Sequence, residues 1–592
     1  MKLPLRSEVK EELKWDITRL YKDRDAVKSD IKSASEIADK MAELKNLKTK
    51  EELKNFLDLY EELMIKVSRL STYSELISTT DMTDTDNVNF ANTIDMSFSP
   101  IFEKISFVEN LILSLDEKII DDYKKTYEDY HVFLDSILRM KGHVLSDEES
   151  KVFASLSYAL NGPYNTYEIS KLADMKFDSF EVDGKTYENS YVLFENFYQY
   201  HEDLKVRRAA FESFSKTLEN YKNTTASLYE MYLNIEKTKA TMCGFDSLID
   251  YHLFGQDVKR ELYDRQIDVI MEDLAPIMRK FEKLVQKFYG IDEMHFADLK
   301  LPIDKEFSKE ISEEESWKYV EEALSVMGDE YLKVAMSAKT DRWVDFASNV
   351  GKSTGGFCSS PYKKGSYILL SWTREFAELY TLVHEIGHGV HFHYAQENNK
   401  ALEEEPSLYF IESPSTCNEI LLSKYLLKNT TDERFRRYIL ANMITNTYFH
   451  NFVTHLLEAH YQREVYYLVD KGEPINADIL SELKLNTLKK FWGDEIVMDK
   501  GAELTWMRQP HYFMGLYSYT YSAGLTISTN AANNIYEKED GAKNWIEALK
   551  AGGTLKIEDL AKLGGVDIST DSALKNTIAY IGSIVDELEK LI

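Results

Sequence analysis

Residues that interrupt helices are scarce in this chain, and this scarcity constrains its fold more than any other feature. Only 10 prolines and 24 glycines occur in 592 residues, and both residue types favour turns and loops. The long stretches between them are rich in Leu, Lys, Glu and Ala, which are good helix formers. The sequence therefore predicts a mainly α-helical protein that is large enough for two or more lobes.

A short β-hairpin is predicted at residues 180–187, where Asp183 and Gly184 supply the positive φ angles of a tight turn. Amphipathic helices are expected on both sides of it. We place a domain boundary beside this hairpin, which gives an N-terminal helical lobe over residues 1–190 and a second region over residues 191–592.

The most informative motif is His384-Glu385-Ile386-Gly387-His388. On a helix, residues four apart share a face, so the two imidazoles can bind one zinc ion. Glu385 then lies beside a water on that metal and can act as its general base. The alternative is a solvated helix face that carries two unrelated histidines.

The residues around this motif predict a helix over 373–394. Gly387 lowers its helix propensity, which makes sense if another element or a substrate comes close there, unless the glycine is only a tolerated defect. Apolar side chains recur at three- and four-residue steps, as in a helix packed into a core: Phe376, Leu379, Leu382, Val383, Ile386 and Val390.

Two histidines leave a tetrahedral zinc ion one protein ligand short, with the fourth position kept for water. His391 is the nearest candidate, but three histidines within two turns would strain the geometry, so we expect it beside the site rather than on the metal. Glu412 and Glu419 are better candidates, because a helix over 410–427 would point both the same way. Two carboxylates on an apolar helix need a cationic partner; the alternative is an ordinary solvated acidic face.

The two motifs together resemble the thimet-oligopeptidase-like family of zinc metallopeptidases, in particular its oligoendopeptidase F branch. His-Glu-Ile-Gly-His is followed by Glu-Ser-Pro-Ser-Thr at residues 412–416. Residues 13–17, 298–302 and 366–372 are similar to further segments of that branch, so the resemblance covers nearly the whole chain.

This resemblance implies that Glu412 is the third ligand of one Zn²⁺ ion per chain and that Glu419 orients a ligand histidine. It also implies two helical lobes around a deep substrate channel, with a small hairpin and a short sheet beside the zinc helix. The region over 191–592 is then the catalytic part. The implied activity is that of a zinc-dependent endopeptidase that hydrolyses internal bonds of short unfolded oligopeptides. A zinc carboxypeptidase on a similar fold and a non-catalytic peptide-binding scaffold are the alternatives.

A cluster near the C-terminus has the chemistry to assist peptide hydrolysis. The oxyanion of the tetrahedral intermediate needs donors beyond the metal, and the family has a histidine followed by tyrosines in this region, which His511 and its neighbours resemble. If this segment is helical, Tyr517 and Tyr521 share a face while Tyr519 points elsewhere. We expect His511, Tyr517 and Tyr521 to be catalytic, with Tyr519 in reserve; an aromatic core stripe is the alternative.

The segment just before the zinc helix, residues 346–372, is rich in Gly and Ser and ends in a β-like run over 366–372. A free edge of such a strand binds peptide backbone whatever its side chains are. We expect it to take an extended peptide, unless the strand is purely structural and the loop lies on the surface.

The acidic composition limits the partners of this chain. Its formal net charge is −30, which disfavours nucleic acid and anionic membranes and leaves short peptides as the expected partners. Three dispersed cysteines form no disulfide framework, which fits a reducing compartment. With neither a signal peptide nor a transmembrane run evident, the expected location is cytoplasmic, and the oligomeric state stays open.

Overall fold

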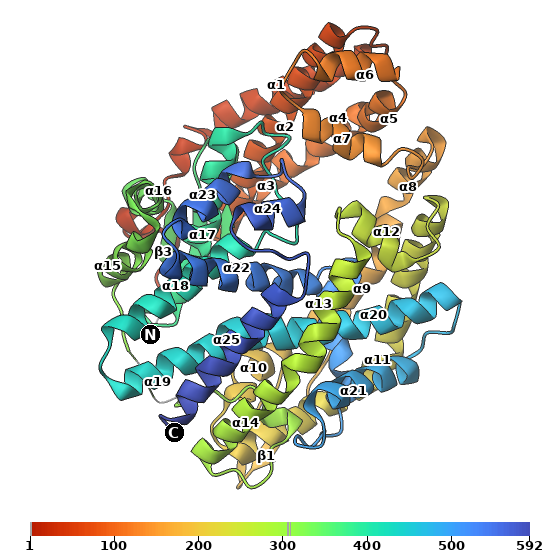
Figure 1. The fold of residues 1–592 in the computed structure, drawn as a ribbon. Helices are drawn as coiled ribbons and strands as arrows, with labels where there is room; N and C mark the ends of the chain where they lie inside the picture. Colours follow the sequence, from red (N-terminus) through yellow and green to blue (C-terminus); the bar gives the residue numbers. More distant parts are fainter. Residues whose placement is uncertain (1–2, 305–306, 308, 354) are drawn as a thin grey trace. The chain divides into compact units, whose positions relative to one another are not determined.

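The computed structural model describes residues 3–304, 307, 309–353 and 355–592, and helices dominate it, as predicted (Figure 1). It divides into two compact units, each assembled from three separate stretches of the chain. The boundary at residue 190 stays a prediction as a functional division. The first unit comprises Met1–Asp147, Ser308–Tyr425 and Ala531–Val566, and the second Glu148–Phe307, Leu426–Asn530 and Asp567–Ile592.

The first unit combines helices with a small sheet. Within the described residues, none of the helices in either unit has both the length and the apolar composition needed to span a bilayer. The helices of the first unit are α1 Arg24–Glu43, α2 Lys50–Thr79, α3 Thr85–Met96, α4 Phe98–Ile105, α5 Val108–Leu113, α6 Glu117–Lys124, α7 His131–Arg139, α15 Glu313–Leu324, α16 Asp329–Thr340, α17 Glu378–Asn398, α18 Ser413–Asn429, α23 Gly541–Ala551 and α24 Ile557–Leu563.

The sheet has three strands, β3 (Val344–Ala347), β4 (Phe357–Ser359) and β5 (Tyr367–Trp372), in the order β3-β5-β4. β5 pairs parallel with β3 and antiparallel with β4. The expectation that the strand over 366–372 offers a free edge is therefore wrong, because both edges of β5 are already paired. Its nearly continuous apolar sequence fits this central position, since α17 packs on the sheet and Tyr367 and Leu369 enter a hydrophobic cluster.

α17 begins at Glu378, a few residues later than the predicted start at 373. Arg374 has a φ of 75°, which cannot continue a right-handed helix. The Glu378 carboxylate accepts hydrogen bonds from the backbone N–H groups of Thr373, at 2.7 Å, and of Arg374, at 3.1 Å. These bonds hold the chain in a turn between β5 and α17.

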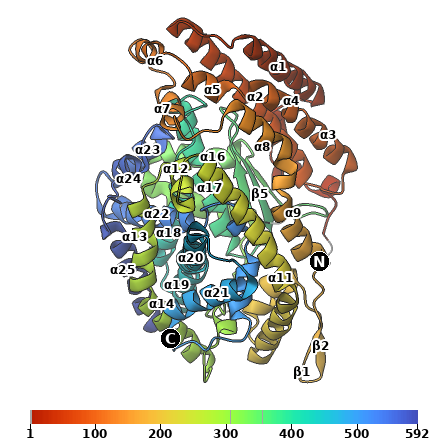
Figure 2. The ribbon, with the colours of Figure 1, turned by 90° about the vertical axis from the view of Figure 1, so that its right-hand side faces the viewer.

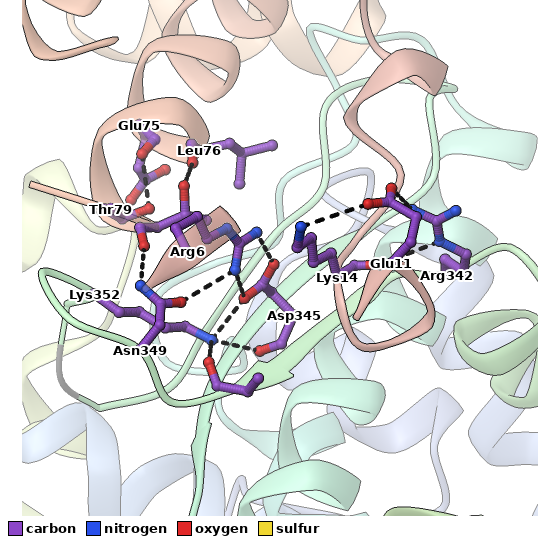
Figure 3. A network of polar contacts seen from close by, with 12 residues as sticks. Arg6, Glu11, Lys14, Glu75, Leu76, Thr79, Arg342, Asp345, Asn349 and Lys352 are labelled. Atoms are coloured by element: carbon purple, nitrogen blue, oxygen red, sulfur yellow. Dashed lines mark hydrogen bonds and ion pairs between the residues drawn. The ribbon is translucent and has the colours of Figure 1, made fainter. Parts of the chain in front are cut away.

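An ionic network attaches the N-terminal segment to β3 (Figure 3). The Arg6 guanidinium donates to both carboxylate oxygens of Asp345, at 2.8 and 2.5 Å. Lys352 Nζ lies 2.7 Å from the same carboxylate. Asp345 is fully buried and the Lys352 side chain is only 2% exposed, so this network belongs to the interior of the first unit.

The second unit contains the predicted hairpin, formed by β1 (Phe180–Val182) and β2 (Lys185–Tyr187), with φ values of 50° at Asp183 and 81° at Gly184. It packs against the long helix α11 (Leu204–Met242), as Figure 2 shows. A π-helical segment, η8 (Met443–Thr454), leads directly into α20 (His455–Lys471). The helices of this unit are α8 Asp147–Leu160, α9 Gly162–Ile169, α10 Tyr191–Asn196, α11 Leu204–Met242, α12 Leu248–Gly255, α13 Arg260–Asp273, α14 Ala275–Tyr289, α19 Glu433–Asn442, α20 His455–Lys471, α21 Ala477–Trp492, α25 Ser572–Glu589 and the part of α22 (Tyr519–Glu537) up to Asn530.

Candidate metal centre

In the first unit, α17 places His384 and His388 one turn apart, with ring centroids separated by 5.1 Å. Glu412 approaches both rings from the residue just before α18. Its Oε2 atom lies 3.5 Å from His384 Nε2 and 3.4 Å from His388 Nε2. One possible ligand atom of each residue lies within 4.8 Å of the other two. The structure thus brings together the three residues proposed from the sequence as metal ligands.

The Glu412 carboxylate is held in its ionised form. Burial opposes its charge, but the imidazoles of His388 and His384 and a hydrogen bond from Ser415 Oγ outweigh burial and lower its pKa to about 2. The Glu412 carbonyl also accepts the Thr416 N–H at 3.2 Å, which starts α18. Glu412 therefore has a fixed backbone and a charged side chain, as a carboxylate ligand requires.

Glu419 fixes the orientation of His384. His384 Nδ1 lies 2.7 Å from Glu419 Oε1, so Nδ1 donates and Nε2 faces Glu412. Burial disfavours protonation of His384, but the hydrogen bond with Glu419 and the nearby carboxylates outweigh it and raise its pKa to about 10. The site therefore favours positive charge at its centre. Zinc in hydrolases takes this donor set, two imidazole nitrogens and one carboxylate. Its ligand histidines commonly have a hydrogen-bond partner on the other ring nitrogen, as His384 has here.

Glu385 lies between the two histidines in sequence, and its side chain has free acceptor capacity. It is only 6% exposed, and burial raises the pKa of its carboxyl group. Within the part of the chain that the structure describes, no hydrogen bond reaches its carboxylate. Gly356 leaves room beside it, because a Cβ there would lie 3.3 Å from Glu385 Oε1. This carboxylate can therefore accept a proton from a small molecule.

Gly387 lets α17 and the first turn of α18 come into contact. This agrees with the expectation that another element comes close there, and not with a tolerated defect. A Cβ at this position would lie 2.6 Å from the Pro414 carbonyl oxygen and 2.7 Å from Ser415 Cα. Asn418 Nδ2 also donates to the Val383 carbonyl at 3.1 Å, which joins the same two helices. The backbone contact thus sets the position of Glu412 relative to the histidines.

His391 lies outside the three-donor group. Its ring is fully buried, neither nitrogen has a hydrogen-bond partner, and its centroid lies 5.7 Å from that of Phe410. Burial lowers its pKa to about 3, so the ring is neutral. This placement agrees with the expectation that His391 is not a ligand.

The second unit gathers the aromatic residues singled out near the C-terminus. The ring centroid of His511 lies 5.5 Å from that of Tyr517 and 5.7 Å from that of Tyr521. The two tyrosine rings are 5.5 Å apart. Tyr519 points elsewhere, as expected for its place in the helix, and its hydroxyl donates to Gln256 at 2.6 Å.

Sequence reasoning missed two residues of this cluster, His455 and Glu458 on α20. Glu458 Oε2 lies 2.8 Å from His455 Nδ1 and 3.4 Å from His511 Nδ1. The His455 ring stacks on Tyr521 at 4.1 Å. Burial opposes ionisation of Glu458, but His455 and the hydrogen bonds outweigh it and lower its pKa. The three-residue spacing of His455 and Glu458 was the available signal, since such a pair shares a helix face.

Comparison with known proteins identifies the class. Residues 197–580 match the family described as Peptidase family M3, and residues 112–177 match the one described as Oligopeptidase F. The first match covers more than half of the chain, so this protein belongs to peptidase family M3 and is a metallo-endopeptidase by class. The family resemblance inferred from the motifs is thereby confirmed.

Individual relatives are similar over nearly the whole chain. Oligopeptidase PepF of Bacillus subtilis is 28% identical over 600 residues, which covers 100% of this chain and 89% of that protein. An oligoendopeptidase F homolog of Borreliella burgdorferi is 28% identical over 596 residues and covers 99% of both chains. The crystal structure of oligoendopeptidase-F from Enterococcus faecium has the same fold, with a TM-score of 0.74, 22% identity and coverage of 95% and 98%.

Proposed function

We propose that this protein is a zinc-dependent endopeptidase that hydrolyses internal bonds of short, unfolded oligopeptides. The observation that carries the proposal is the convergence of His384 Nε2, His388 Nε2 and Glu412 Oε2 on one point, with Glu419 on the far nitrogen of His384. The names of the relatives, oligoendopeptidase F and oligopeptidase PepF, support oligopeptides as substrates.

Each residue then has a distinct task. A bound zinc ion would supply Lewis acidity to a water molecule and to the peptide carbonyl. His384, His388 and Glu412 hold the metal, and Glu419 keeps the His384 ring in the productive orientation. Glu385 accepts the proton of the attacking water and passes it to the leaving amine, and its raised pKa suits both transfers. The roles predicted for His511, Tyr517 and Tyr521 as donors to the carbonyl oxygen remain predictions.

Replacement of Glu385 by Gln tests this assignment. Glu385→Gln removes the proton acceptor but leaves the three ligands in place, so zinc should still bind with a stoichiometry of about one. We expect kcat/KM on a fluorogenic peptide to fall by about 10²- to 10⁴-fold, the usual contribution of a general base. Glu397→Gln, an exposed acid on the same helix, is the matched control and should keep full activity.

The substrate should be a peptide with both ends blocked. Cleavage of an acetylated and amidated peptide at an internal bond supports the endopeptidase, whereas cleavage only when the C-terminus is free supports the carboxypeptidase alternative. Purified protein without stoichiometric zinc, and with hydrolysis unaffected by a chelator, would contradict the metal assignment. Full activity in Glu385→Gln would contradict the mechanism.

A further inference from the structure

A cavity of about 450 Å³ lies within the second unit. Its wall includes residues of η8, α20 and α21, with others near Glu195, Lys300 and Arg508. Its volume falls in the range of sites that bind small molecules, roughly 300–1,000 Å³. His450 and Glu458 line it as well, so it borders the cluster of His455 and His511.

The charge of this cavity is opposite to that of the whole chain. Its two carboxylates already have partners, because Glu195 Oε1 lies 3.0 Å from Arg508 Nε and Glu458 binds the His455 ring. Burial lowers the pKa of His450 to about 3, so that ring adds no charge. Against these two acids the wall carries four cationic side chains: Lys171, Lys300, Lys484 and Arg508.

The hydrogen bonds of Lys171 and Lys300 go only to neutral groups. Lys171 Nζ donates to the Arg508 carbonyl at 2.8 Å, and Lys300 Nζ donates to the Thr454 hydroxyl at 3.0 Å. Lys300 also lies over the Phe449 ring, 4.5 Å from its centroid. None of these direct contacts supplies a negative charge, and the carboxylates of Glu195 and Glu458 act on the lysines only from beyond hydrogen-bond distance.

Lys484 is the most deeply buried of these three lysines. It is 5% exposed, and its Nζ lies 5.5 Å from the centroid of the Tyr461 ring. No hydrogen bond or ion pair joins its ammonium group to any residue that the structure describes. Burial lowers its pKa to about 8. Attraction from Glu458 offsets burial only in part. A buried charge without a direct hydrogen-bond or ion-pair partner destabilises a fold, and an apolar side chain of similar length would avoid that cost.

We propose that this cavity is a binding site for a carboxylate, with Lys484 as its anchor and Lys300 and Lys171 as supporting cations. The carboxylate belongs either to the C-terminus of a peptide or to a small free acid, and both present the same chemistry to the wall. The inference goes beyond the proposed function and does not depend on it, because it concerns binding and not hydrolysis.

The test is a binding measurement on the full-length chain carrying Glu385→Gln, so that peptide is not consumed. The probes are acetyl-tetra-alanine with a free C-terminal carboxylate, the same peptide as its amide, and succinate as a free acid. Isothermal titration should show the free-acid peptide binding at least about tenfold more tightly than the amide, as one charge-assisted hydrogen bond implies.

Lys484→Met keeps the length of the side chain and removes its charge. It should abolish the difference between the two peptides, while Lys489→Met, at an exposed position of the same helix, should preserve it. Lys484→Met should fold at least as well as the parent, because it removes an unpaired buried charge. An unchanged far-ultraviolet circular dichroism spectrum and an equal or higher Tm would therefore exclude a folding defect as the cause.

The outcomes separate the two sources of the carboxylate. A preference for the free-acid peptide that depends on Lys484 identifies the peptide C-terminus. Equal binding of both peptides, together with succinate binding that Lys484→Met abolishes, identifies a free acid. If neither the peptide preference nor succinate binding depends on Lys484, the proposal is overturned. Loss of hydrolysis in other variants bears only on the proposed function.

Discussion

At the scale of single residues, His384 is held between two carboxylates that use opposite sides of its ring. Glu412 lies 3.5 Å from Nε2, and Glu419 lies 2.7 Å from Nδ1. A carboxylate in the position of Glu419, on the ring nitrogen that faces away from a metal, fixes the tautomer and the direction of a ligand histidine. Two acids that look alike in the sequence therefore contact opposite nitrogens of one ring, and we propose a different role for each.

Removal of Glu419 should weaken metal binding without removing a ligand. We expect Glu419→Ala to reduce zinc affinity by about 10- to 100-fold, measured by competition with a chromophoric chelator. Glu419→Gln keeps an oxygen acceptor for Nδ1 and should lie between Ala and the wild type. Glu397→Gln serves again as the control. Equal zinc affinity in the Ala variant and the wild type would rule out the positioning role.

Lys484 gives a second prediction at this scale, in the pH dependence of stability. Its pKa is about 8 in the folded chain, against 10.5 for an unperturbed lysine. Between these two pH values the unfolded state binds more protons than the folded state. The free energy of unfolding of the wild type therefore increases as the pH rises. The excess stability of Lys484→Met should be largest below pH 8 and shrink toward pH 10.5, as urea unfolding at several pH values can measure. A constant difference over this range would contradict the buried charge.

The residues found from the sequence and those missed differ in the range of their contacts. His384 and His388 form a local pattern, which helix periodicity alone reveals. His455 and Glu458 form an equally local pair, but its importance comes from His511, which lies 53 residues further along the chain than Glu458. No periodicity encodes such a contact, so the pair was not singled out from the sequence.

At the scale of elements, the decisive contact is the backbone approach of α17 to α18 at Gly387. Alanine in place of an interior helical glycine normally stabilises by about 1 kcal/mol. Here the added Cβ would lie 2.6 Å from the Pro414 carbonyl oxygen, which belongs to the backbone and cannot turn aside. Overpacking of this kind costs about 1–3 kcal/mol, so the clash outweighs the gain in propensity.

Gly387→Ala should therefore lower the free energy of unfolding and also weaken zinc binding, because it displaces the turn that carries Glu412. Gly255→Ala is the matched control: Gly255 is also helical, and nothing lies within 4 Å of the point where its Cβ would be added. The control should be neutral or slightly stabilising. Denaturant unfolding and zinc titration of both variants give the comparison, and equal behaviour of the two would refute the close-contact argument.

The helix that carries His384 and His388 and the hairpin were both predicted well from the sequence, because each has a strong local signal. It misjudged the role of β5, for which a free edge was expected. β4 contains only three residues and β3 only four, and neither stands out in a chain dominated by helices. The strands that cover both edges of β5 were therefore not visible from their own residues.

At the scale of the whole molecule, each compact unit combines stretches that are far apart in sequence. Arg6 reaches Asp345 across 339 positions, and Lys352 shares the same buried carboxylate (Figure 3). Length and composition predicted the helical class, but they carry no signal for such pairings. The single boundary expected near residue 190 reflects this limit, because a local signal, the hairpin turn, was all that was available to place it.

The network around Asp345 should be important for the stability of the first unit. Asp345→Asn leaves Arg6 and Lys352 without a negative partner, and breaking a buried pair in this way costs about 3–5 kcal/mol. Glu11→Gln, which removes the exposed partner of Arg342, should change stability by only about 0–1 kcal/mol. Chemical denaturation measures both. Similar small losses in the two variants would show that the buried network contributes little.

Because the first unit is assembled from distant stretches of the chain, its packing cannot be completed until late in synthesis on the ribosome. α17 ends at Asn398, yet α23, which packs against it, ends only at Ala551. At about 5–20 residues per second, roughly 8–30 s of synthesis separate the two helix ends. Through that interval the face of the histidine-bearing helix that packs on α23 lacks its cover, so chaperones that shield nascent chains should matter most for yield during translation of this stretch.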